Sequence, residues 1–113
     1  MSPITTHVLD TTLGRPAGDV PVTLEVQRDG AWQQTGSGVS DADGRLRTLL
    51  DAAGPLSGGV YRLTFYTAAY FERVGIRPFY PRVLVEFTVA DGEPHYHVPL
   101  LLSPFGYTTY RGT

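Results

Sequence analysis

The feature that most constrains the fold is a two-residue alternation of apolar side chains, which recurs in several windows of the chain. In the clearest window, residues 83–89, a valine or phenylalanine stands at every second position before the turn dipeptide Asp91-Gly92. Because successive side chains of a strand point to opposite faces, this spacing predicts a strand with one buried face. Thirteen glycines and nine prolines supply turns and leave room for few helices. The chain is therefore expected to consist mainly of β-strands joined by turns.

The same signal predicts the rest of the architecture. Extended segments are expected around His7 and over residues 20–27, 32–40, 61–66, 95–102 and 107–111. The window Ala68–Val74 has no turn residue and predicts about two helical turns, with Gly75 as the stop signal. Roughly seven or eight short strands with frequent turns are typical of an all-β, antiparallel β-sandwich, here with one short helix. The length of 113 residues predicts a single domain, residues 1–113.

Composition narrows the class of partner. Nine basic and eleven acidic residues give a net charge of −2 without a basic stripe, so neither nucleic acid nor an anionic membrane is expected as a partner. The absence of cysteine excludes disulfides and thiolate zinc sites. The first seven residues lack the features of a secretory signal, and no apolar run approaches the ~20 residues of a membrane span. A soluble, cytoplasmic protein is expected, small enough that a binding site would lie between subunits rather than inside one core.

Strand parity separates the side chains of the segment that begins at His95. Its even-numbered positions carry Tyr96, Val98, Leu100 and Leu102, an apolar face that suits the core. The opposite face carries His95, His97, Pro99 and Leu101. A histidine among apolar residues on an outward face indicates an interface or a binding groove. By the same parity His7 shares a face with Thr5, and Thr108 shares one with Tyr110.

Each of these residues also has an ordinary structural explanation. A lone histidine on a strand, such as His7 or His95, is usually a solvated surface residue, and Arg45 after Asp43-Gly44 would ordinarily be a solvated turn residue. His95 and His97 at alternate positions could chelate a metal, but two ligands are too few for a structural site, so no metal is expected. The stretch 41–44 is similar to a calcium loop but lacks the closing glutamate. Composition and spacing alone indicate a small β-sandwich of open function.

Longer motifs resemble one known family. The segments His7-Val8-Leu9-Asp10 and Gly14-Arg15-Pro16-Ala17 resemble the opening of the transthyretin-like proteins, and Asp43-Gly44-Arg45 is similar to their central motif. The tail, His95-Tyr96-His97-Val98-Pro99-Leu100-Leu101-Leu102-Ser103-Pro104 with the closing Tyr110-Arg111-Gly112, resembles the enzymes of that family, the 5-hydroxyisourate hydrolases. The resemblance covers essentially the whole chain. One departure is Thr113, where these enzymes usually have serine.

The resemblance implies a fold, an activity and a site. It implies an eight-stranded sandwich that forms a homotetramer, a dimer of dimers with active sites in the channel between the dimers. It implies hydrolytic ring opening of 5-hydroxyisourate, a step of urate degradation, without a cofactor or a metal. His7 and His97 are the implied catalytic residues, and Arg45 and Tyr110 the implied substrate-binding residues. Thr113 and His95 are secondary candidates, and the sequence leaves open which histidine is the general base.

Two other classes of protein share such a fold. A carrier of the transthyretin type would use the same channel to bind a small ligand without chemistry. A structural or adhesive β-sandwich would need no such channel. The histidines, Arg45 and the tail Tyr110-Arg111-Gly112 favour the enzyme, because a carrier of apolar ligands has no need of them.

Overall fold

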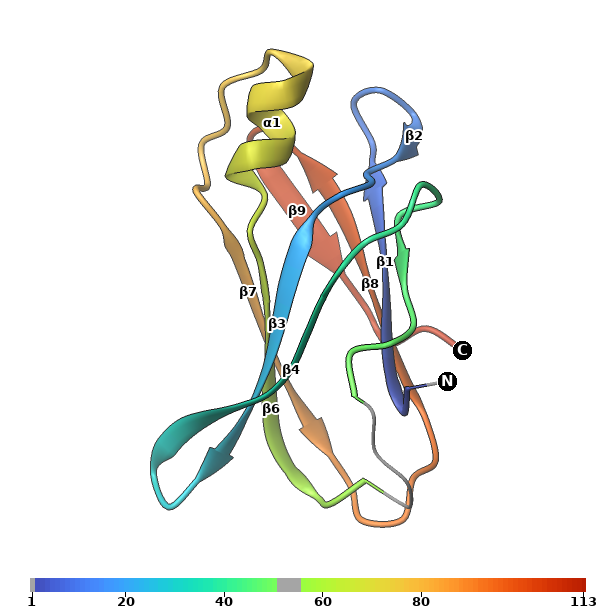
Figure 1. The fold of residues 1–113 in the computed structure, drawn as a ribbon, viewed down its shortest axis with the longest axis vertical. Helices are drawn as coiled ribbons and strands as arrows, with labels where there is room; N and C mark the ends of the chain where they lie inside the picture. The colour runs from blue at the N-terminus through green and yellow to red at the C-terminus, as the bar shows by residue number, and fades with distance from the viewer. Residues whose placement is uncertain (1, 51–55) are drawn as a thin grey trace.

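Two β-sheets lie face to face in the computed structural model, which describes residues 2–50 and 56–113 (Figure 1). The elements are β1 (Ile4–Asp10), β2 (Arg15–Pro16), β3 (Pro21–Arg28), β4 (Ala31–Val39), β5 (Arg45–Leu46), β6 (Gly59–Phe65), α1 (Ala68–Val74), β7 (Val83–Val89), β8 (Tyr96–Ser103) and β9 (Gly106–Thr109). One sheet has the order β2-β1-β8-β9, with β5 also paired to β1, and the other has the order β4-β3-β6-β7. The predicted all-β sandwich with one short helix is confirmed.

The local sequence patterns predicted the long strands well but did not predict the shortest ones. The predicted segments 20–27, 32–40, 61–66 and 83–89 correspond to β3, β4, β6 and β7 within two residues at each end. The two-residue strands β2 and β5 were not predicted, because two residues cannot display a period. The last strand ends at Thr109 rather than at the predicted Arg111.

One strand pair departs from the antiparallel pairing that the sequence predicts. Strands β1 and β8 run parallel, in a register from Ile4 opposite Tyr96 to Asp10 opposite Leu102. The other pairs among the described strands are antiparallel. A parallel pair needs a long crossover connection, and here the crossover contains the whole second sheet. Hairpin signals reveal only neighbours along the chain, so they could not show this pairing.

The core lies between the sheets and is built by strand alternation. The predicted inward face of β8 is confirmed, since Tyr96, Val98, Leu100 and Leu102 are all buried. Opposite them, strands β3, β6 and β7 contribute Val22, Leu24, Leu63, Phe65, Val83 and Val85. Full burial of one such side chain stabilises the fold by about 1.5–3 kcal/mol relative to its exposure. The outer face of β8 is thereby left for another use.

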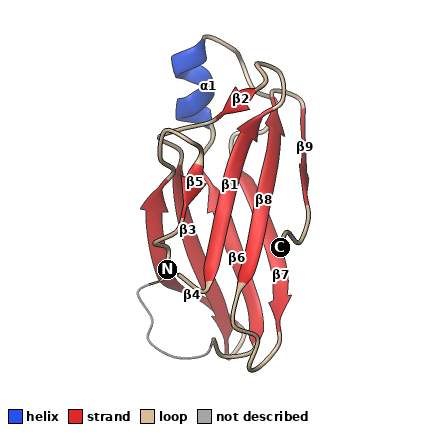
Figure 2. Ribbon diagram, turned by 90° about the vertical axis from the view of Figure 1, so that its right-hand side faces the viewer, coloured by secondary structure: helices blue, strands red, loops and turns tan. Residues whose placement is uncertain are grey.

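Helix α1 lies at one end of the sandwich (Figures 1 and 2). It ends at Gly75 as predicted: this residue has φ 75° and donates its N–H to the carbonyl of Glu72. Buried Tyr70 and Phe71 hold the helix to the core, and the Tyr70 hydroxyl donates to the Asp10 carboxylate at 2.5 Å. Over the described parts of the chain, no helix has the length and apolar character needed to cross a bilayer.

Candidate active site

The candidate site lies on the outer face of the sheet that contains β1 and β8 (Figure 2). Strand register places its residues beside one another: His7 is opposite Arg45 on one side and Pro99 on the other. Thr5 lies opposite His97, which in turn forms a bridge with Gly112 of the tail. Because neighbours across strands share a face, the outward residues of β1, β5 and β8 meet at one level of the sheet.

A cavity of about 170 Å³ opens on this face. It is lined by Thr5, Thr6, Arg45, Arg47, His95, His97 and Thr113. Four of the predicted site residues are among them: His97, Arg45, and the two secondary candidates His95 and Thr113. These four come from β5, from β8 and its approach, and from the C-terminal tail, so the tertiary fold brings them together.

His7 is not among the residues that line this cavity, although it lies opposite Arg45 in the strand register. Its Nε2–H donates to the backbone carbonyl of Asp43 at 2.8 Å. A carbonyl oxygen can only accept, so this hydrogen bond places the ring proton of neutral His7 on Nε2. The Nδ1 atom of that ring is left with its lone pair.

His97 of β8 and His95, which directly precedes β8, share one hydroxyl. Thr5 Oγ1 lies 2.8 Å from His97 Nδ1 and 3.0 Å from His95 Nε2. The two imidazole rings are nearly parallel, with an interplanar angle of 13° and centroids 6.4 Å apart. Thr5 therefore fixes the orientation of both rings. The sequence placed Thr5 on the same face as His7 but did not predict this role.

The environment of His97 favours its neutral form. Burial lowers the pKa of His97 below its ordinary value, and the neighbouring His95, His7 and Arg45 lower the pKa further by charge repulsion. A histidine with a depressed pKa is unprotonated at neutral pH and can accept a proton there.

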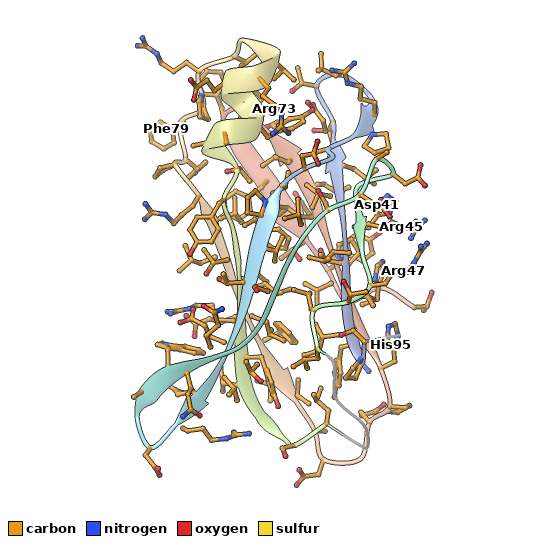
Figure 3. All side chains as sticks on the ribbon, viewed as in Figure 1. Asp41, Arg45, Arg47, Arg73, Phe79 and His95 are labelled. Atoms are coloured by element: carbon orange, nitrogen blue, oxygen red, sulfur yellow. The ribbon has the colours of Figure 1, made fainter. Side chains whose placement is uncertain are left out.

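Two arginines supply positive charge to the cavity. Arg45 and Arg47 occupy alternate positions, and Figure 3 shows them extending from the same side of the molecule as His95. Among the described residues neither guanidinium has a carboxylate within 4.0 Å, since the two ion pairs found there are Arg62–Glu25 and Arg111–Glu93. Arg47 was not predicted, although its two-residue spacing from Arg45 was a readable signal.

A tight turn presents Arg45 to the site. The Asp41 carboxylate accepts the backbone N–H groups of Asp43 and Arg45 at 2.9 and 3.0 Å, and the hydrogen bond from Arg45 is the main reason that the pKa of Asp41 is lowered. Gly44 in this turn has φ +76°, and a Cβ there would lie 2.2 Å from the Val8 carbonyl oxygen. The stretch 41–44, which is similar to a calcium loop, therefore serves as a turn. Its Asp41 carboxylate accepts hydrogen bonds from the backbone of the same turn.

Tyr110, like His7, does not line this cavity. It is 53% exposed and lies on the rim of a second hollow of about 320 Å³, beside Thr109 and Arg111. The register that pairs Leu100 with Thr109 continues to the bridge between His97 and Gly112, so Tyr110 lies opposite Pro99. Tyr110 lies beyond the end of β9, and the hollow that it lines also includes Val98 from the inward face of β8.

The C-terminal tail closes one side of the site. The Gly112 N–H donates to the His97 carbonyl at 2.8 Å, and this bridge brings Thr113 into the cavity. A Cβ on Gly112 would lie 2.8 Å from His97 Cδ2, so only glycine permits the tail to pass this close to the ring.

Metal-ligating side chains do not gather in threes here. Within residues 2–50 and 56–113, no group of three or more His, Cys, Asp or Glu side chains is placed to hold a metal ion. One ring nitrogen of His95, Nε2, and one of His97, Nδ1, are hydrogen bonded to the Thr5 hydroxyl.

A two-sheet sandwich with histidines and arginines on the outer face of one sheet defines a class that known proteins share. Residues 4–112 match the HIUase/Transthyretin family, and the chain belongs to that family. It is 45% identical over 112 residues to a 5-hydroxyisourate hydrolase of Salmonella typhimurium, covering 97% of this chain and 80% of the relative. It is 44% identical over 114 residues to a 5-hydroxyisourate hydrolase of Deinococcus radiodurans, covering 97% and 95%.

Solved structures agree with this assignment. The structure of Klebsiella pneumoniae 5-hydroxyisourate hydrolase superimposes with a TM-score of 0.83 at 40% identity, covering all of both chains. Sea bream transthyretin in complex with thyroxine superimposes with a TM-score of 0.89 at 38% identity, covering 98% of this chain and 95% of the other. Fold similarity alone therefore does not separate enzyme from carrier, and the site must do so.

Proposed function

We propose that this protein is a hydrolase that opens the six-membered ring of 5-hydroxyisourate, giving 2-oxo-4-hydroxy-4-carboxy-5-ureidoimidazoline in urate degradation. The observation that carries the proposal is the meeting of His97, Arg45 and Thr113 at one cavity. Relatives from several bacteria that are 42–45% identical over nearly the whole chain are 5-hydroxyisourate hydrolases. An imidazole held neutral, beside a guanidinium that has no carboxylate partner among the described residues, suits hydrolysis of a cyclic amide.

His97 is the general base in the proposed mechanism. Its lowered pKa keeps the ring unprotonated at neutral pH, and its Nδ1 is occupied by Thr5, so Nε2 is the atom that takes a proton from the attacking water. His7 has Nε2–H engaged with the Asp43 carbonyl and a free Nδ1, which accepts a hydrogen bond from a substrate N–H or, when protonated, donates to the substrate. The sequence leaves the choice between the two histidines open, and the proposal assigns the general base to His97.

Arg45 stabilises the charge that develops on the substrate. Attack of water on the ring carbonyl converts its oxygen into an oxyanion, and a planar guanidinium offers two parallel N–H donors to such an oxygen. Because Arg45 has no carboxylate partner within the described chain, its charge is available to the substrate. We assign Arg47 to the same task at the other end of the planar ligand and Tyr110 to substrate positioning.

We propose further that the working form is a homotetramer in the cytoplasm. A cavity of about 170 Å³ is smaller than the ~300 Å³ at which small-molecule sites begin, so a second subunit facing it would complete the site. Strands β7 and β9, at the ends of their sheets, offer edges for pairing of subunits into dimers. Light scattering during size exclusion measures the mass, and cell fractionation tests the location; a monomer that catalyses at full rate would contradict the shared site.

The enzyme and carrier functions predict different assays. Purified protein should accelerate the loss of freshly generated 5-hydroxyisourate, followed by near-ultraviolet absorbance, above the spontaneous decay. His97→Ala should lower kcat/KM by about 10²–10⁴-fold, the usual contribution of a general acid–base group. Arg45→Gln should also lower kcat/KM. Its control is Arg73→Gln, because the Arg73 guanidinium donates to the Gly18 carbonyl and does not line the cavity. Thyroxine binding without hydrolysis would favour the carrier and overturn the proposal.

A further inference from the structure

The hydroxyl of Thr5 is unusual for a strand threonine in this protein, because its hydrogen-bonding partners are two titratable rings. Thr5 is only 4% exposed, and its Oγ1 lies within 3.0 Å of both His95 Nε2 and His97 Nδ1. The adjacent Thr6, by contrast, donates its hydroxyl to the Val98 carbonyl. The sheet register sets this arrangement, since Thr5 lies opposite His97 and the odd-numbered residues of β8 and its approach share one face.

A threonine hydroxyl carries one proton, so Thr5 can donate to only one of the two rings at a time. When Thr5 donates to His95, His97 donates its Nδ1–H to Thr5 and has a lone pair on Nε2. When His95 donates from Nε2 to Thr5, the hydroxyl proton points to His97 Nδ1, and neutral His97 carries its own proton on Nε2. The first arrangement makes His97 a base, and the second makes it a proton donor. The state of one ring thus determines the tautomer of the other.

We propose that His97, Thr5 and His95 form a proton relay, in which His95 is the terminal acceptor and Thr5 is a positioning residue. This inference rests on the proposed function, and it adds two residues to the reaction. His97 Nε2 takes a proton from water and becomes an imidazolium. The Nδ1–H bond of His97 then breaks as its proton passes to Thr5 Oγ1, and the Thr5 O–H bond breaks as that proton passes to His95 Nε2.

The relay conserves atoms and charge and leaves His97 ready to act as an acid. Thr5 ends with one O–H bond as it began, and a single positive charge moves from His97 to His95. His97 is then neutral with a proton on Nε2, which it can give to the leaving nitrogen of the opened ring. His95 is partly exposed, so it can release its proton to solvent after turnover. Charge repulsion from His95, His7 and Arg45 acts on His97, and Arg47 lines the same cavity.

The first arm of the test reads the tautomers directly and needs no substrate. Long-range ¹H–¹⁵N correlation spectra of labelled protein report which nitrogen of each imidazole carries the proton, over a titration from about pH 5 to pH 9. In the wild type, protonation of His95 should shift neutral His97 toward the form with its proton on Nε2. In Thr5→Val, which keeps the strand shape and removes the hydroxyl, the tautomer of His97 should no longer respond to His95. An unchanged response in Thr5→Val overturns the relay.

The second arm measures catalysis. Thr5→Val should lower kcat by about 10- to 100-fold, toward the lower end of a positioned acid–base contribution, with less than about a twofold change in KM. Thr5→Ser, which keeps the hydroxyl, should restore the rate and the tautomer response. Thr11→Val is the matched control, because the Thr11 hydroxyl donates to the Leu102 carbonyl at the other end of the β1–β8 pair.

The outcomes separate the relay from the proposed function. Wild-type protein that does not hydrolyse 5-hydroxyisourate overturns the function, and the spectra of Thr5→Val then decide the coupling of the two rings alone. Active wild type with a fully active Thr5→Val overturns the relay and leaves the function standing. Equal losses in Thr5→Val and Thr5→Ser would show that Thr5 acts by packing, and this also overturns the relay.

Discussion

The bridge between Gly112 of the C-terminal tail and His97 makes Gly112→Ala a direct test of the geometry of the site. The new Cβ would lie 2.8 Å from His97 Cδ2 and 3.3 Å from Pro99 Cγ, so the ring, the tail or both must move. The tail is held at this point by the hydrogen bond from the Gly112 N–H to the His97 carbonyl. The substitution therefore acts on the bridge that brings Thr113 into the cavity.

The structure allows two responses, and their free energies differ. Keeping the tail in place overpacks the site, which costs about 1–3 kcal/mol. Releasing the tail breaks one hydrogen bond, which costs about 0.5–1.5 kcal/mol. Release is the cheaper response, so the free energy of unfolding should fall by only about 1 kcal/mol. Activity should fall far more, by about 10²-fold in kcat/KM, because release of the tail removes Thr113 from the cavity and a misplacement of about 1 Å at a site has that effect.

The measurement pairs urea unfolding at fixed protein concentration with the hydrolase assay. Gly106→Ala is the matched control: it lies in the same C-terminal segment, and a Cβ there would meet its nearest neighbour, Ser103 Oγ, at an ordinary 3.8 Å. This control should leave kcat/KM within about twofold of wild type. If Gly112→Ala keeps wild-type activity, the tail does not form part of the site and the reasoning fails.

Two further predictions concern pH and the helix anchor. Arg45→Gln removes one of the positive charges that lower the pKa of His97, so that pKa should rise, and the fall of kcat/KM on the acid side should move to higher pH; a pH–rate profile checks this, and an acid limb that stays in place contradicts it. Tyr70→Phe removes the hydrogen bond to the Asp10 carboxylate, which is 1% exposed and also accepts the backbone N–H groups of Thr12 and Leu13. We expect the free energy of unfolding, measured by urea denaturation, to fall by about 1–3 kcal/mol while kcat/KM stays unchanged. A loss of activity without a loss of stability would refute the structural role of this hydrogen bond.

Local sequence patterns predicted the long strands and the helix. The alternation over 95–102 located the buried face of β8, and Gly75 marked the end of α1, because both signals depend on a few adjacent residues. Pro99 was predicted to face outward and is nevertheless buried, since the tail at Gly112 passes over it. That cover depends on a contact between distant residues, which no local period encodes.

The residues of the candidate site were likewise predicted only in part. His97, Arg45, His95 and Thr113 were predicted and line one cavity, whereas His7 and Tyr110 do not line it and stay predictions for the assembled protein. Thr5 and Arg47 were missed as site residues because a threonine and a second arginine on short strands carry no motif of their own.

Alternation of side chains was enough to locate the long strands and the apolar side of each, because side-chain direction alternates within a single strand. The motifs that resemble the family are also local. The parallel pairing of β1 with β8, and the position of the tail beside β8, depend on the whole fold. That pairing sets Thr5 between two histidines about ninety residues away, at 2.8 and 3.0 Å. Pairing of distant strands depends on how the whole core packs, so the hydroxyl that links the two rings becomes visible only in the folded chain.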